Sequence, residues 1–165
     1  MQKYCMPLLR PALDDIDRRL LDLLQIDADQ TLRELGDQVG LTPSAVQRRI
    51  KRFKKAGLMR TVAVLDAQQT TGLTQALVML TLAEESPTLH RRLANRLRKD
   101  PAVQQCYTLS GRWDYAVLVS AASVRELRDL SNRLFKSDDN IRRYDTMFVL
   151  DTVKAGTVIP VDLLG

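Results

Sequence analysis

The chain has 165 residues, which is enough for one compact domain or two small ones. Apolar residues are 45% of the total and charged residues 27%, a composition typical of a soluble globular protein, and no stretch approaches the roughly 18 apolar residues of a membrane span. The net charge of +5 lies mostly in residues 1–60, which hold 12 Lys/Arg against 8 Asp/Glu, and it favours an anionic partner.

The first residues and the cysteines indicate the compartment. Residues 1–12 contain two prolines and no periodicity, so they are predicted to form a flexible N-terminal arm, and they lack the apolar core of a signal peptide. Cys5 and Cys106 belong to no CxxC pattern, which argues against a disulfide framework or a zinc site and favours a reducing compartment. We therefore expect a cytoplasmic protein that has no contact with a membrane.

Three short amphipathic helices are predicted next. The first begins at residues 14–15, where acidic side chains suit the N-terminal end of a helix. The second begins at a capping box over residues 31–34 and ends at Gly40, and the third begins after Thr42 as its N-cap. Because about three residues with a glycine separate the last two helices, the order is that of a helix-turn-helix, whose second helix enters the DNA major groove.

The third helix is strongly basic. Val46, Ile50 and Phe53 recur on one face and are predicted to be buried, whereas cations cover the other faces and Gly57 ends the helix. Residues 38–65 contain no acidic residue. A solvated surface helix is the alternative interpretation, but such a helix normally mixes charges of both signs. The pattern therefore favours nucleic-acid binding by this helix.

A change of pattern separates two domains. Residues 61–65 are β-rich and are predicted to form a wing strand that packs on the helices. Polar, aperiodic residues follow, and we place a linker at residues 66–73. Residues 13–65 then form a winged helix-turn-helix domain, and residues 74–165 form a second domain.

The second domain is predicted to alternate strands and helices. The strands cover residues 75–82, 103–110, 113–121 and 142–153, and the helices begin at Pro87 and after Ser123. The order β-α-β-β-α-β is that of a ferredoxin-like domain. Residues 157–161 are expected to add a fifth short edge strand, where Pro160 is tolerated. The predicted fold class is α+β, with an N-terminal winged helix-turn-helix domain and a C-terminal ferredoxin-like βαββαβ domain.

The predicted DNA contacts fall into two groups along the third helix. Ser44, Gln47 and Arg48 lie in its N-terminal part and are expected to reach base edges, where Arg can bind guanine and Gln can bind adenine. The other cations are expected at phosphates, which supply affinity and salt dependence: Arg49, Lys51, Arg52, Lys54 and Lys55. Arg49 has the alternative of an ion pair with an acid of the first helix. Thr42 is structural as an N-cap, and the N–H groups beside it also suit a phosphate.

The link between the second and third strands contains candidates for ligand binding. Gly111 is a position at which a backbone can approach a ligand closely, although a turn alone also explains a glycine. Asp114 begins an otherwise apolar strand, and its carboxylate could bind the ammonium group of a ligand or pair with Arg112 or Arg142. Trp113 is the only tryptophan, and such a residue is more often core or interface than ligand lid. The residues alone leave these alternatives open.

With both halves placed, the chain resembles the Lrp/AsnC (feast/famine) family of bacterial and archaeal transcription regulators over about residues 13–155. In the first half the resemblance rests on the start and the leucines of the first helix, on the turn into the basic helix, and on positions within and after the two later helices. These are LDDID at 13–17, Leu20, Leu21, Leu23, Leu24, Leu35, VGLTPS at 39–44, Val46, Arg49, Ile50, Gly57 and Leu58. In the second half it rests on SGRWDY at 110–115, which is similar to the family's G-x-x-D turn.

The resemblance implies a DNA-binding domain joined to a domain that oligomerises and binds an effector. It implies a homodimer whose sheets pack face to face, further assembly to a tetramer or octamer, and a small amino acid bound between dimers beside the turn. The implied effector-binding residues are Ser110, Gly111, Arg112, Asp114 and Tyr115, with Thr146 and Phe148 contributed by a neighbouring subunit. Trp113 beside Arg112 departs from simpler versions of this turn, so we expect a pocket that prefers a large apolar or aromatic amino acid.

These features together predict a sequence-specific DNA-binding transcriptional regulator whose oligomeric state or DNA occupancy responds to a small amino acid. The alternative is an architectural protein that wraps DNA and needs no ligand. We expect neither a cofactor nor a metal, and we do not expect an enzyme, because His90 is the only histidine and no metal-spaced cluster, nucleophile triad or phosphate loop occurs.

Overall fold

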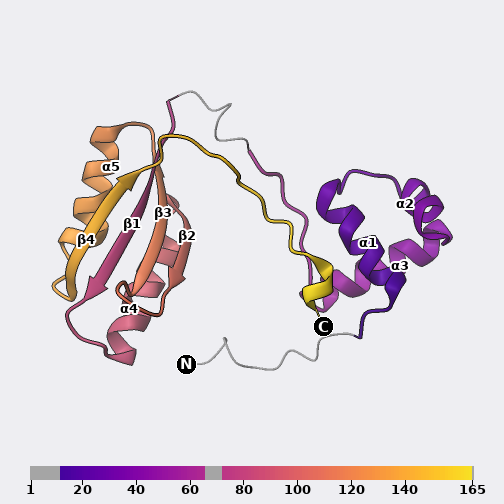
Figure 1. Ribbon diagram of the computed structural model, residues 1–165, viewed down its shortest axis with the longest axis horizontal. Coiled ribbons are helices and arrows are strands. Elements are labelled where there is room, and N and C mark those ends of the chain that lie inside the picture. Colours follow the sequence, from indigo (N-terminus) through magenta and orange to yellow (C-terminus); the bar gives the residue numbers. More distant parts are fainter. Residues whose placement is uncertain (1–11, 66–71, 165) are drawn as a thin grey trace. The chain divides into compact units, whose positions relative to one another are not determined.

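The computed structural model describes residues 12–65 and 72–164 (Figure 1). The predicted arm at residues 1–12 and the predicted linker at residues 66–73 therefore lie outside the described residues, except for Ala12, Gly72 and Leu73. The chain divides into two compact units. The first contains the described residues up to Val64 together with those from Lys154 onward, and the second contains the residues between them.

Three helices form most of the first unit: α1 (Asp15–Ile26), α2 (Leu32–Val39) and α3 (Pro43–Lys55). Each begins at its predicted cap. Asp14 and Asp17 form a reciprocal capping box on α1, residues 31–34 form the predicted capping box on α2, and Thr42 caps α3. The predicted end of α3 at Gly57 is also confirmed, because this glycine adopts a left-handed φ of 69°.

Two glycines shape the turn between α2 and α3. Gly40 caps α2 with a left-handed φ of 70°, a conformation that side chains disfavour. Gly36 lies inside α2, where a Cβ atom would overlap the carbonyl oxygen of Leu41. That close approach lets the Leu41 N–H donate to the Gly36 carbonyl at 2.9 Å, which tightens the turn. The predicted helix-turn-helix geometry therefore depends on a glycine that the sequence pattern did not single out.

The core of the first unit includes the C-terminal end of the chain. Its buried residues are Leu20, Leu21, Leu24, Leu35, Val39, Val46, Phe53 and Val161. Val161 begins the 3-10 helix η3 (Val161–Leu164) and is only 4% exposed. Just ahead of it, the side-chain amide of Gln25 on α1 donates to the Ile159 carbonyl at 3.0 Å and accepts from the Ile159 N–H at 2.8 Å. The C-terminal segment is therefore fastened to α1.

Two predicted strands are missing from the described residues, and both predictions are wrong. Residues 61–65 have no regular secondary structure, and Val62 and Val64 are exposed instead of packing on the helices as a wing. Residues 157–161 form no fifth edge strand, because Val161 enters the helical core instead. The described residues from Lys154 onward accordingly group with the first unit, whereas the sequence predicted a second domain over all of residues 74–165.

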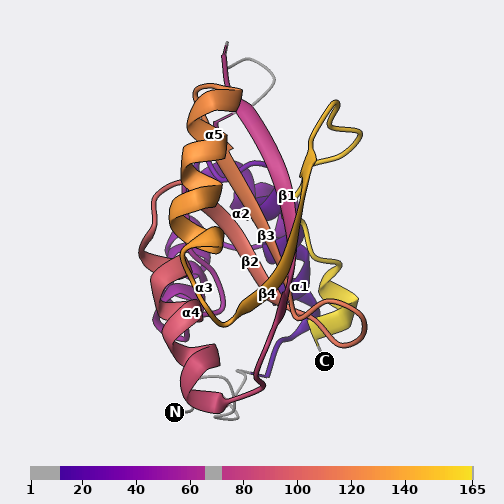
Figure 2. The ribbon, with the colours of Figure 1, turned by 90° about the vertical axis from the view of Figure 1, so that its left-hand side faces the viewer.

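The second unit is an antiparallel sheet with helices on one face (Figure 2). Its elements are β1 (Thr74–Leu82), α4 (Pro87–Lys99), β2 (Val103–Thr108), β3 (Tyr115–Ala121), α5 (Val124–Ser131) and β4 (Ile141–Phe148). A short π-helical turn, η2 (Asn132–Lys136), extends α5. The strand order is β2-β3-β1-β4, so the predicted ferredoxin-like arrangement is confirmed. Ala76, Val78 and Leu80 alternate along β1 and are fully buried in the core beneath the helices.

Three strands are shorter than predicted, and their partners explain why. β4 ends at Phe148 rather than at residue 153, because Phe148 already lies opposite Ala76 and β1 begins only two residues earlier. β2 ends at Thr108 and β3 begins at Tyr115, because the Leu109 N–H donates to the Asp114 carbonyl at 2.9 Å and closes the link between them. The observed link between the two strands is therefore longer than the two residues predicted.

Candidate DNA interface and effector site

Helix α3 presents a basic surface that nearby acids do not neutralise. Of the predicted DNA contacts, all but Arg49 are exposed: Thr42, Ser44, Gln47, Arg48, Lys51, Arg52, Lys54 and Lys55. Four of these cations form no ion pair with any described residue: Arg48, Lys51, Lys54 and Lys55. The apolar face of the helix is turned inward, since Val46 and Phe53 are fully buried. The arrangement leaves fixed positive charges available for an anionic partner.

Two arginines of α3 are held by acids of α1. Asp17 is fully buried, and one of its carboxylate oxygens accepts from Arg49 while the other accepts from Arg52. Arg49 also donates to Asp14, with 2.7 Å between its Nη1 and Oδ2. The sequence alternative of an ion pair between Arg49 and an acid of the first helix is therefore confirmed. Arg52 was expected at a phosphate, and its side chain remains 45% exposed beside this pair.

This network fixes the orientation of α3 on α1. The hydrogen bond from Arg49, followed by the one from the Asp17 N–H, holds the pKa of Asp14 below its usual value. The hydrogen bonds from Arg49 to the side chains of Asp14 and then Asp17 raise the pKa of Arg49. Because Asp17 is buried, it depends on the two guanidinium groups that face its carboxylate. Arg49 therefore acts mainly as a positioning residue for the exposed cations of its helix.

The N-terminal end of α3 has a hydroxyl cap and no acidic neighbour in its first turn. The Thr42 Oγ1 accepts from the Ala45 N–H at 3.4 Å and lies 3.1 Å from the Ser44 hydroxyl oxygen. The capping role predicted for Thr42 is confirmed. The positive end of the helix dipole and the exposed Ser44 hydroxyl thus lie side by side, next to the exposed side chains of Gln47 and Arg48.

The link between β2 and β3 is tied to the end of β1. Gly111 has a φ of 126°, which only glycine adopts readily. The Asp114 N–H donates to the Leu80 carbonyl at 2.9 Å, and an Asp114 carboxylate oxygen accepts from the Leu82 N–H at 2.6 Å. Asp114 pairs with neither Arg112 nor Arg142. Its carboxylate therefore holds the backbone of the turn in shape.

Tyr115 belongs to the core rather than to an open site. It is 1% exposed, and its hydroxyl lies 2.8 Å from Nδ1 of His90 on α4. Burial is the main cause that raises the pKa of Tyr115. The His90 ring packs 5.7 Å from the Tyr115 ring, centroid to centroid. These two residues join α4 to the sheet immediately after the turn.

The structure does not bring Thr146 and Phe148 to the turn within this chain. Thr146 lies opposite Val78 and Phe148 lies opposite Ala76, nearer the start of β1 than the Leu80–Leu82 segment that binds Asp114. Both therefore lie on the helix-covered side of the edge strand. Phe148 is 45% exposed there. The contribution of these two residues from a neighbouring subunit stays a prediction.

A depression of about 250 Å³ lies beside the turn. Its lining consists of Thr81, Leu82, Arg112, Trp113, Arg142 and Arg143. The guanidinium carbons of Arg112 and Arg143 each lie 5.3 Å from the centroid of the Trp113 ring, within the range of a cation–π contact. Ser110 and Gly111 are exposed next to this lining. Arg142 and Arg143 were not among the predicted effector-binding residues, and the sequence indicated Arg142 only as a possible ion-pair partner of Asp114.

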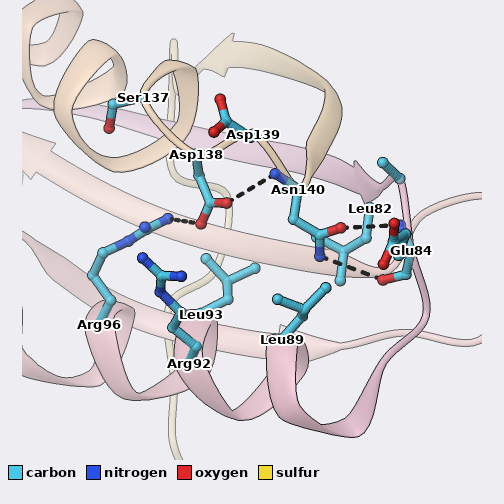
Figure 3. Close-up of a pocket in the computed structure, with 11 residues that line it drawn as sticks. Leu82, Glu84, Leu89, Arg92, Leu93, Arg96, Ser137, Asp138, Asp139 and Asn140 are labelled. Atoms are coloured by element: carbon cyan, nitrogen blue, oxygen red, sulfur yellow. Dashed lines mark hydrogen bonds and ion pairs between the residues drawn. The ribbon is translucent and has the colours of Figure 1, made fainter.

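A second depression, of about 310 Å³, lies between α4, the end of β1 and the turn after η2 (Figure 3). Arg96 and Asp138 form an ion pair of 2.6 Å across it. Asn140 fastens the turn to Glu84 through bonds of 3.0 and 3.3 Å. The Arg92 side chain points into the depression and forms no ion pair with a described residue. None of the predicted effector-binding residues lines this space.

Neither a metal cluster nor a membrane-spanning helix occurs in the part of the chain that the structure describes. Among residues 12–65 and 72–164, no group of three His, Cys, Asp or Glu side chains could hold a metal ion. Over the same ranges, no helix is both long and apolar enough to cross a membrane.

Comparisons with known proteins agree with both halves of the chain. Residues 13–54 match the model of the AsnC-type helix-turn-helix domain, and residues 75–159 match the Lrp/AsnC ligand binding domain. The HTH-type transcriptional regulator LrpA of Mycobacterium tuberculosis is 34% identical over 86% of this chain and 93% of its own length. The transcriptional activator DecR of Escherichia coli K12 is 30% identical over 91% of this chain and 99% of its own length.

Solved structures give the same result. An AsnC family transcriptional regulator from Agrobacterium tumefaciens superposes with a TM-score of 0.84 at 26% identity, and covers 92% of this chain and 99% of its own. A transcriptional regulator from Neisseria meningitidis, solved as a complex with L-Met, superposes with a TM-score of 0.82 at 27% identity. That match covers 93% of this chain and 99% of the other.

Proposed function

The chain belongs to the Lrp/AsnC family of transcriptional regulators, and we propose that α3 reads a DNA operator while the Gly111 turn binds a small amino acid that changes DNA occupancy. The observation that carries the DNA half is the separation of roles along α3. Arg49 and Arg52 are bound to α1, whereas Arg48, Lys51, Lys54 and Lys55 are exposed and unpaired among the described residues. Helix position and DNA contact therefore depend on different side chains.

The two groups of contacts divide affinity from sequence choice. Ser44, Gln47 and Arg48 lie in the N-terminal turns of α3, the part that reaches base edges in helix-turn-helix complexes. Lys51, Lys54 and Lys55 lie further along and are suited to phosphates. The exposed part of Arg52 and the N–H groups beside Thr42 add two more phosphate contacts.

The amino-acid half is supported by a relative and by the geometry of the turn. The regulator from Neisseria meningitidis binds L-Met, and it matches this chain over nearly its whole length. In this chain, Asp114 and Tyr115 hold the turn in place, so that Ser110, Gly111 and Arg112 are exposed on a fixed backbone. We assign the direct contacts to these three exposed residues and a supporting role to Asp114 and Tyr115. Family membership supports a regulator rather than an enzyme.

The uncovered face of the sheet supports assembly into a homodimer. Met147 lies opposite Leu77, on the face away from the helices, and is 46% exposed. Tyr107 lies opposite Ala116 on the same face and is 55% exposed. Exposed apolar side chains gathered on one sheet face are typical of a protein–protein contact. We propose that two copies pair through this face, with a tetramer or octamer as the further assembly.

The experiment is a DNA-binding assay on a duplex selected by the protein from a random pool. The full chain is expected to retain this duplex, and Arg48→Gln with Lys51→Gln together is expected to release it. Arg125→Gln serves as the control, because Arg125 is exposed on α5 and has no ion pair among the described residues. A mixture of the twenty amino acids is expected to shift the midpoint by about 5- to 150-fold. Unchanged retention by the double variant would contradict the DNA assignment, and an unchanged midpoint would contradict the effector assignment.

A further inference from the structure

A β-bulge directs two consecutive arginines toward one depression. Side chains of consecutive residues in a regular strand point to opposite faces. The pairing of β4 with β1 shifts between Thr81 and Leu82, since Thr81 lies opposite Arg143 and Leu82 lies opposite Ile141. Arg142 is therefore an extra residue without a partner on β1. Because a bulge re-aims side chains, Arg142 and Arg143 can both line the depression beside the turn, together with Arg112.

The depression holds more positive charge than its surroundings neutralise. Its lining has three arginines and no acidic side chain. Asp145 pairs with Arg143 at 2.8 Å, and the carboxylate of Asp114 accepts from the Leu82 N–H without forming an ion pair with an arginine. Arg112 and Arg142 form no ion pair with a described residue. Two guanidinium groups in the same small space therefore have no carboxylate partner among the described residues.

We propose that this depression binds a small dicarboxylate, so that the effector is an acidic amino acid or the corresponding 2-oxo acid. The proposal rests on the proposed function, because it names the ligand of the same turn. One carboxylate can form two parallel hydrogen bonds with one guanidinium group, so two free arginines match a ligand with two carboxylates. The volume of about 250 Å³ suits a compact ligand rather than a large one.

This ligand class replaces the large apolar or aromatic amino acid that Trp113 suggested. The indole is not an open apolar wall, because the guanidinium groups of Arg112 and Arg143 both lie against its ring. Trp113 instead holds these two cations in position through cation–π contacts. An aromatic ligand that stacked on the indole would have to displace both guanidinium groups from the ring.

The test is calorimetry on the full chain with six ligands. L-Glutamate with L-glutamine and L-aspartate with L-asparagine are matched pairs that differ by one carboxylate, whereas 2-oxoglutarate is a further dicarboxylate and L-methionine a further neutral amino acid. At least one dicarboxylate is expected to bind about tenfold or more tightly than its matched amide or, for 2-oxoglutarate, than L-methionine. Arg142→Gln is expected to weaken that binding by a similar factor, whereas the control Arg125→Gln leaves it unchanged. Tighter binding of glutamate or of 2-oxoglutarate identifies the source, and either result supports the dicarboxylate class.

Three results would overturn the inference. The first is that no dicarboxylate binds more tightly than the neutral ligands, or that the Arg142→Gln variant binds the preferred dicarboxylate as tightly as the parent chain does. The second is a change in solution mass of that variant without ligand, which would make the arginines a subunit contact. The third is a shift of operator binding by a neutral amino acid but by no dicarboxylate, which would leave the proposed function intact. Failure of the proposed function differs from these, because then no amino acid or 2-oxo acid shifts operator binding.

Discussion

Two pairs of arginines in this protein have opposite electrostatic surroundings. Arg49 and Arg52 meet the buried carboxylate of Asp17, whereas Arg112 and Arg142 meet no carboxylate among the described residues. The first pair fixes α3 on α1, and the second pair stays available for an anion. The role of an arginine in this protein therefore follows from whether an acid accompanies it, and a run of basic residues can contain both kinds.

The largest expected effect comes from removing the acid of the first pair. Asp17→Asn leaves two guanidinium groups facing a buried neutral amide, so we expect the first unit to lose about 3–5 kcal/mol of stability. Denaturant unfolding of the full chain, followed by circular dichroism, measures this loss. Asp15→Asn is the matched control, because Asp15 is exposed on the same helix and has no ion pair among the described residues. Equal midpoints for the two variants would show that the Asp17 network contributes little.

Removing an arginine without an acidic partner is expected to weaken DNA binding and to leave stability unchanged. Arg48→Gln should leave the unfolding midpoint unchanged and weaken operator binding by about 1–3 kcal/mol, with relaxed choice at one base pair. Fluorescence anisotropy on the operator and on single-base variants measures both effects. If Arg48→Gln instead lowered stability and kept its sequence preference, the division between free and paired arginines would fail.

Arg52 combines features of the arginines that have an acidic partner and of those that have none. It pairs with Asp17, yet 45% of its side chain is exposed. We expect Arg52→Gln to lower both the unfolding midpoint and the DNA affinity, each by less than the change made by Asp17→Asn or Arg48→Gln, at about 1 kcal/mol. The same two assays measure it. An effect confined to only one of them would assign Arg52 fully to one class.

The smallest expected effect concerns pH. The pKa of Asp14 is lowered in the folded chain, chiefly by the hydrogen bond from Arg49, so its contribution is present above the ordinary value of 3.8 and is lost as pH falls below it. We expect the unfolding midpoint of the first unit to decline on acidification through this range. Asp14→Asn should reduce that decline slightly, since the group is exposed. Identical pH profiles for the variant and the parent chain would contradict this contribution.

Local signals were enough to predict most of the elements and the basic face of α3. The capping box at residues 31–34, the N-cap Thr42 and the helix-ending Gly57 each act within a few residues, and all three are confirmed. The burial of Val46 and Phe53 follows from a helical period of apolar residues that is visible in the sequence alone.

What the sequence could not show depends on residues far apart in the chain. Val161 reaches a core built by residues more than a hundred positions earlier, so a local pattern favoured an edge strand instead. The bulge at Arg142 is a property of strand register, which neither strand reveals alone. In the sequence Asp17 appears only as part of the LDDID stretch at 13–17, because its burial against two arginines of α3 has no local signature.

The most direct test of the central claim is the salt dependence of operator binding by the parent chain and by the Arg48→Gln, Lys51→Gln variant. If the free cations of α3 bind DNA, Lys51 neutralises a phosphate and releases a counterion from the DNA. The plot of log K against log salt concentration then becomes shallower by about 0.9 for each phosphate that the variant no longer neutralises. We predict a shallower slope with an unchanged unfolding midpoint. The same slope and the same affinity in both proteins would contradict the account.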